Sequence, residues 1–81
     1  MPSPDPRHRG RLRRARQDAA VILGLLREGE PLLALDHVAR ARRRVLRGEP
    51  RPEVRLLHVA RRIDWLESLA RARLRPAERA A

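Results

Sequence analysis

The chain has no cysteine and no lysine, and a single tryptophan is its only residue among Trp, Tyr and Phe. Without cysteine it forms no disulfide and offers no thiolate for a zinc site or for nucleophilic catalysis. Long apolar runs are also missing: a membrane-spanning helix needs roughly 18 or more apolar residues, and the longest run is Ala19–Leu26. Because the absence of cysteine fits a reducing compartment, we expect a cytoplasmic protein.

Groups suited to catalysis or metal binding are few and badly spaced. The only serines are Ser3 and Ser68, and His58 lies roughly three helical turns before Ser68, too far along one helix to serve as its base. No two of the 3 histidines stand at a helical ligand spacing. We therefore expect no enzyme, no metal site and no cofactor.

The charge balance is strongly basic. The chain holds 20 basic and 10 acidic residues, for a formal net charge of +10, and every basic residue is arginine. A GC-rich genome favours arginine codons over lysine codons, which accounts for the missing lysine but not for the excess of basic over acidic residues. That excess predicts a phosphate-rich or acidic partner.

Proline and glycine divide the chain into an arm, a domain and a tail. We expect residues 1–8 to form a flexible, proline-rich basic arm, residues 9–75 a three-helix domain, and residues 76–81 a frayed tail. The predicted helices cover residues 9–28, 31–47 and 52–75. Gly29 ends the first helix, and Pro31 suits the first position of the second.

These helices predict an all-α fold. Short connections place neighbouring helices antiparallel, which gives a small up-down-up three-helix bundle, or a helical hairpin whose third helix pairs elsewhere. A chain of this size buries only about 60% of its unfolded surface, so a partner or a homodimer is one way to complete the core.

Apolar residues recur at helical spacing in all three segments. The predicted core residues are Leu12, Ala15, Ala19, Ile22, Leu23 and Leu26; Ala34, Leu35, Val38, Ala39, Val45 and Leu46; and Leu56, Val59, Ala60, Ile63, Leu66, Ala70 and Leu74. Arg42 falls on the apolar face of the second helix. We expect it to reach an edge or to pair with Asp64 or Glu67, unless that face is an exposed partner surface.

Arginines form a stripe on the opposite face of the second helix. Such a stripe is either a solvated charged face or a surface that follows nucleic-acid phosphates. Asp36, four residues before Arg40, is the only well-placed local partner. The candidate nucleic-acid-binding residues are Arg40, Arg43, Arg44 and Arg47 of this stripe, with Arg11, Arg13 and Arg14 of the first helix.

Trp65 lies off the apolar stripe of the third helix. It has three interpretations: a cap packed against the N-terminal arm, an anchor in a partner or homodimer interface, or a stacking platform for a nucleobase. Val21 and Leu25 likewise lie opposite the main apolar face of the first helix. The candidate partner-interface residues are Trp65, Leu69, Val21 and Leu25.

Two functions fit these features best. The first is a non-enzymatic protein that binds nucleic acid, DNA or RNA, or a ribonucleoprotein through arginines on the phosphate backbone. The alternative is a protein-interaction module, such as a regulator, adaptor or accessory subunit of a larger complex, whose basic surface meets an acidic protein surface. A membrane-surface role is a third, weaker fit. Salt distinguishes the first two, because phosphate binding weakens steeply with salt and an apolar interface does not.

Overall fold

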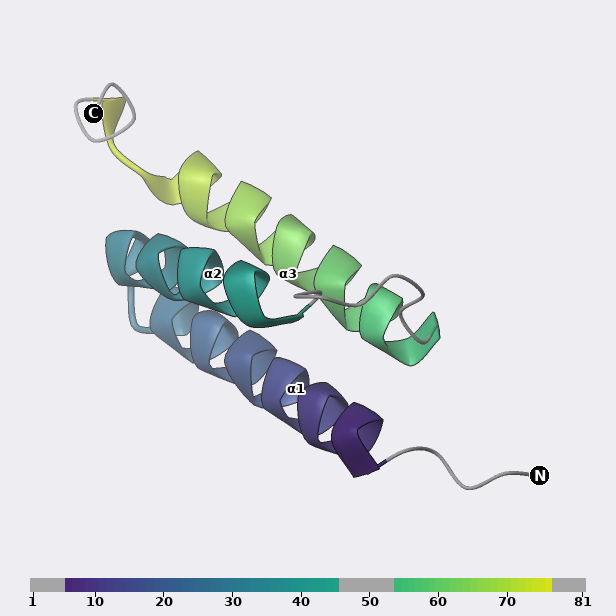
Figure 1. Cartoon of the computed structure of the whole chain (residues 1–81). Coiled ribbons are helices and arrows are strands. Elements are labelled where there is room, and N and C mark those ends of the chain that lie inside the picture. The colour runs from purple at the N-terminus through teal and green to yellow at the C-terminus, as the bar shows by residue number, and fades with distance from the viewer. Residues whose placement is uncertain (1–5, 46–53, 77–81) are drawn as a thin grey trace.

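The chain folds into three α-helices. The computed structural model describes residues 6–45 and 54–76, which form α1 (Pro6–Arg27), α2 (Pro31–Val45) and α3 (Val54–Arg73) (Figure 1). The predicted all-α class is confirmed. Most of the predicted arm and tail, together with Arg47 and Pro52, lies outside these residues. None of the helices in the described ranges combines the length and apolarity needed to cross a membrane.

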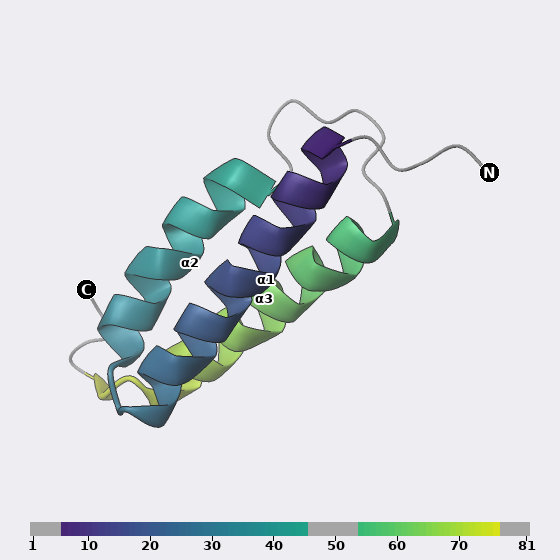
Figure 2. The same cartoon turned by 90° about the horizontal axis from the view of Figure 1, so that it is seen from below.

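The three helices form an up-down-up bundle. Each helix packs against both others, and α2 runs antiparallel to α1 and α3 (Figures 1 and 2). The guanidinium of Arg73, at the end of α3, donates a hydrogen bond of 2.9 Å to the carbonyl oxygen of Leu26, at the end of α1. This bond adds a second donor to a carbonyl in the last turn of α1, which also accepts the N–H of Gly29. In such an arrangement the outer surface of the α1–α3 seam faces away from α2.

The turn between α1 and α2 follows the local sequence. Gly29 adopts a positive φ of 77°, a backbone conformation that residues with a Cβ rarely adopt. The N–H of Glu30 donates to the carbonyl of Leu25 (2.9 Å) and that of Gly29 to Leu26 (3.1 Å), the two bonds of a Schellman C-cap. Pro31 then opens α2. The predicted turn at Gly29 and the start at Pro31 are confirmed, and α1 ends at Arg27, one residue before its predicted end.

Two other boundaries differ from the prediction. α1 begins at Pro6 rather than Arg9, because a proline in the first turn lacks only an N–H that would have no helical acceptor. α3 ends at Arg73 rather than Arg75. The helical conformation is disfavoured for a residue that precedes proline, and Arg75 precedes Pro76.

The core follows most of the predicted stripes. Its buried apolar residues are Leu12, Ala15, Ala19, Ile22, Leu26, Ala34, Val38, Ala41, Leu56, Ile63, Leu66, Ala70 and Leu74. The exception is α2, where Ala41 is buried although it was not predicted and Ala39 is exposed although it was. The two neighbouring helices lie on the side of α2 that carries Ala34, Val38 and Ala41, which turns Ala39 to solvent.

Candidate nucleic-acid interface

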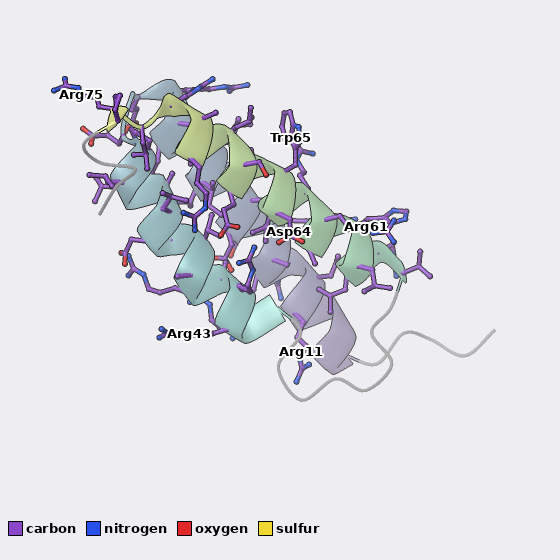
Figure 3. All side chains as sticks on the ribbon, turned by 90° about the horizontal axis from the view of Figure 1, so that it is seen from above. Arg11, Arg43, Arg61, Asp64, Trp65 and Arg75 are labelled. Atoms are coloured by element: carbon purple, nitrogen blue, oxygen red, sulfur yellow. The ribbon has the colours of Figure 1, made fainter. Side chains whose placement is uncertain are left out.

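The arginine stripe of α2 is partly paired with acids. Arg40 donates a hydrogen bond to Asp36, one turn earlier, as the spacing predicts. Arg44 reaches across to α1, where its Nη2 lies 2.8 Å from Asp18 Oδ1. Arg43 points to solvent (Figure 3) and makes no side-chain hydrogen bond or ion pair within the described ranges. Arg47 lies outside those ranges. Of the three stripe arginines that the structure describes, only Arg43 is therefore unpaired.

Arg42 connects α2 to α3. Its guanidinium donates to Asp64 Oδ1 at 2.5 Å and to both carboxylate oxygens of Glu67 at 3.1 and 3.2 Å. Hydrogen bonds to Asp64 and then Glu67 stabilise the charged form and raise the pKa of Arg42 above its ordinary value. The side chain is about half exposed. The expected pairing of Arg42 with Asp64 or Glu67 is therefore confirmed, and both acids take part.

Asp18 forms a polar site at the α1–α2 seam that the sequence analysis missed. Its side chain is only 9% exposed, and Oδ1 accepts hydrogen bonds from Arg44 and from His37 Nε2, the latter at 3.0 Å. Oδ2 is buried and has no hydrogen-bond partner among the described residues. Asp18 stands out in the sequence as an acid next to an apolar run, but only the packing of α1 against α2 places it opposite His37 and Arg44.

Each acid within the described helices contacts a side chain of α2. Asp18 contacts His37 and Arg44, Asp36 contacts Arg40, and both Asp64 and Glu67 contact Arg42. No other acid occurs within the three helices as they are described. Figure 3 shows Asp64 on the side of α3 that faces α2. The negative charge of the bundle is thus concentrated around one helix.

The opposite side of the bundle, at the α1–α3 seam, carries a groove with arginines and no acid. It is about 310 Å³ in volume and is lined by Arg16, Ala19, Ala20, Leu23, Val59 and Arg62. We call it the seam groove. Arg16 comes from α1 and Arg62 from α3. Both are exposed, and neither has a hydrogen-bond or ion-pair partner in the part of the chain that the structure describes. Neither is one of the seven candidate nucleic-acid-binding residues predicted above, although Arg16 belongs to the arginine-rich first half of α1.

The predicted arginines of α1 differ in exposure. Arg13 and Arg14 are exposed, and both lack an ion-pair partner within residues 6–45 and 54–76. Arg11 is partly buried and lies near the start of α1 (Figure 3). Arg13 and Arg14 are therefore the arginines of this predicted group that are available to a ligand.

The predicted partner-interface residues also divide into two groups. Trp65 is 59% exposed and projects from α3 away from the bundle (Figure 3). Val21 is also largely exposed, whereas Leu25 and Leu69 are partly buried and pack against the core. The indole is therefore the largest apolar group of the four that is open to solvent.

Neither a metal site nor a known relative assigns a function to this surface. Within the described residues, no group of three His, Cys, Asp or Glu side chains is placed to hold a metal ion. No family model, curated protein or solved structure matches the chain. The physical properties of the surface are therefore the basis for a functional proposal.

Proposed function

We propose that this protein binds the phosphate backbone of nucleic acid through exposed arginines that have no acidic partner, chiefly on α1 and α3. The observation that carries the proposal is the separation of charge: the acids of the described helices contact α2, while Arg16 and Arg62 stand without a partner at the α1–α3 seam. Unpaired guanidinium groups bind phosphate oxygens strongly and with little dependence on sequence. A cytoplasmic location belongs to the same proposal.

Whether an arginine already contacts an acid determines how much it contributes to phosphate binding. An arginine already bound to a carboxylate must give up that bond to meet a phosphate, so Arg40 and Arg44 gain less than an unpaired arginine does. We therefore retain Arg13, Arg14 and Arg43 from the sequence-based set and add Arg16 and Arg62. The latter two lie on neighbouring helices around one groove.

Salt dependence tests this proposal. Labelled duplex DNA and structured RNA are titrated with the full chain at about 50 and about 200 mM salt, where phosphate contacts lose affinity steeply. Replacing Arg16 and Arg62 together by Gln lowers the slope of log K against log salt by roughly 2, since each contact with duplex DNA contributes about 0.9.

A matched variant isolates the position of the charge. Arg40→Gln with Arg42→Gln removes the same charge from arginines that already contact acids, and we expect most of the affinity and slope to remain. Equal losses in the two double variants would show that net charge alone attracts nucleic acid. No binding to either probe at about 50 mM salt would refute the proposed function.

One observation favours a second function. Trp65 is 59% exposed, and tryptophan and arginine are the residues that protein interfaces favour. A protein-interaction module would use Trp65 with Val21, and its basic surface would meet an acidic protein. Analytical ultracentrifugation of the wild type and of Trp65→Ala tests the homodimer. A sedimentation coefficient that rises with protein concentration in the wild type, and stays constant in the variant, would support self-association through the indole.

A further inference from the structure

We infer that the seam groove accepts an unpaired nucleotide, with the base over its apolar floor and the neighbouring phosphates between Arg16 and Arg62. This inference rests on the proposed function and narrows its ligand to nucleic acid that contains a single-stranded segment. It concerns a groove whose two arginines are not among the seven candidate nucleic-acid-binding residues predicted from the sequence.

The lining of the groove is more apolar than phosphate binding alone would require. Besides the two arginines, its lining consists of Ala19, Ala20, Leu23 and Val59. A phosphate gains nothing from an apolar floor, whereas an unstacked base has an apolar face that is stabilised when it is removed from water. A base within a duplex has both faces stacked and its edge paired, so it cannot reach such a floor unless it leaves the helix.

The two arginines bracket the floor from different helices. Arg16 comes from α1 and Arg62 from α3, so a backbone that crosses the seam meets a guanidinium on either side of the base. Along α1 the lining extends from Arg16 to Leu23, roughly 10 Å at 1.5 Å per residue. That length matches a ligand of one or two nucleotides.

Other occupants fit the groove less well. A second copy of this chain offers few free carboxylates to Arg16 and Arg62. The acids of its described helices contact α2, which leaves Glu28 and Glu30 in the tight α1–α2 turn. An acidic amphipathic helix from another protein would supply the charge. Such a helix inserts several bulky anchors along a hydrophobic groove, whereas the small side chains of Ala19 and Ala20 leave room on this floor for a flat base.

Trp65 provides a reporter beside this groove. It follows Arg62 by three residues on α3, a spacing that places two side chains on neighbouring parts of a helix surface. It is also the only tryptophan, in a chain without tyrosine. Its fluorescence therefore reports a ligand that reaches α3, without any added label.

The test compares single-stranded and double-stranded probes on the full chain. An oligonucleotide of about 12 nucleotides, a length within the usual range of single-strand sites, is titrated alone and as a duplex at equal phosphate concentration. We expect the single strand to bind at least roughly 5-fold more tightly, the effect of burying about 40 Å² of apolar surface at about 25 cal/mol per Å², and to change the fluorescence of Trp65.

Substitutions that fill the groove distinguish the contribution of its apolar floor from that of its arginines. Ala20→Leu adds bulk to an exposed position in the groove, and Ala39→Leu makes the same change at an exposed position of α2. We expect Ala20→Leu to lose the single-strand preference while it keeps its duplex affinity, and Ala39→Leu to keep both. Ala20→Gln fills the same space with a polar group and should behave like Ala20→Leu. Far-UV circular dichroism verifies that all three variants are folded.

The outcomes distinguish this inference from the proposed function. If neither probe binds, both fail. If both probes bind equally, or if Ala20→Leu and Ala39→Leu behave alike, the groove assignment fails and backbone binding stands. A designed helical peptide of Glu and Leu is the third probe. If Ala20→Leu weakens binding of this peptide but not of the single strand, the groove belongs to a protein partner and the inference is overturned.

Discussion

The seams around α2 and the seam between α1 and α3 differ in how they use charge. At the α2 seams, Arg42 and Arg44 are held by Asp64, Glu67 and Asp18. At the α1–α3 seam, Arg16 and Arg62 line a groove with no acid from the described helices. The four acids of the described helices therefore contact side chains of α2, while the groove on the opposite side of the bundle is lined by arginines and apolar residues.

The apolar content of the helices explains this difference. α2 contributes only Ala34, Val38 and Ala41 to the described core, whereas α3 contributes larger side chains that include Ile63 and Leu66. Because burial stabilises roughly in proportion to apolar area, α2 gains the least from packing. Ion pairs and hydrogen bonds with α1 and α3 therefore help to fix the position of α2, which its small core side chains hold only weakly.

The largest effect comes from the core that supports both regions. Leu66 is fully buried, so we expect Leu66→Ala to lower the free energy of unfolding by about 2–5 kcal/mol. Urea denaturation followed by circular dichroism measures the change. Leu32→Ala, at an exposed position of α2, is the control and should change little. A small loss for Leu66→Ala would mean that the helices do not depend on one shared core.

The next test compares the stability of variants at the α1–α2 seam and at the α1–α3 seam. Asp18→Ala removes the hydrogen bonds to His37 and Arg44 and should lower stability by about 1.5 kcal/mol, the low end for bonds to a charged group. Loss of the buried Oδ2, which has no partner among the described residues, offsets part of the cost. Arg16→Gln should change stability by less than roughly 0.5 kcal/mol, because its side chain is exposed. Equal melting temperatures for the two variants would contradict the contrast between the seams.

A smaller effect is expected at the α2–α3 seam. Arg42 is 51% exposed, and solvent screens its bonds to Asp64 and Glu67, so Arg42→Gln should cost at most about 1 kcal/mol. Raising the salt concentration should shrink the difference between wild type and variant, since exposed ion pairs are screened. A loss that is large and independent of salt would instead indicate that Arg42 acts through packing.

The smallest effect is expected at Trp65. Because the indole is 59% exposed, Trp65→Ala should change the free energy of unfolding by no more than roughly 0.5 kcal/mol. Thermal unfolding at several protein concentrations makes the measurement. A loss well above that value, independent of protein concentration, would favour the interpretation of Trp65 as a cap and remove it from the candidate interface.

Local sequence was a good guide where the physics is local. Gly29 and Pro31 end one helix and begin the next because their backbone preferences act within one turn. The helical spacing of Ile22, Ile63 and Leu66 predicted that they are buried. The pair of Asp36 with Arg40 needs only a helix, because four residues separate the two side chains.

Contacts between helices were predicted less completely. The position of Arg42 on an apolar face indicated a partner on the third helix, and Asp64 and Glu67 provide it. Asp18 carried no such signal. Its contact with His37 and Arg44 depends on the register of α1 against α2, which helical periodicity does not specify.

The sequence by itself determined the three helices, the turn at Gly29, most of the buried stripes and the strongly basic charge. Apart from Arg40 and Arg42, whose acidic partners the sequence indicated, only the tertiary structure decided which arginines are neutralised and which remain open to a ligand. Local periodicity places a side chain on a face of its own helix, but the distance to a charge on another helix depends on how the helices pack. For this reason Arg44 lies against Asp18, while Arg16 and Arg62 line a groove that no acid of the described helices reaches.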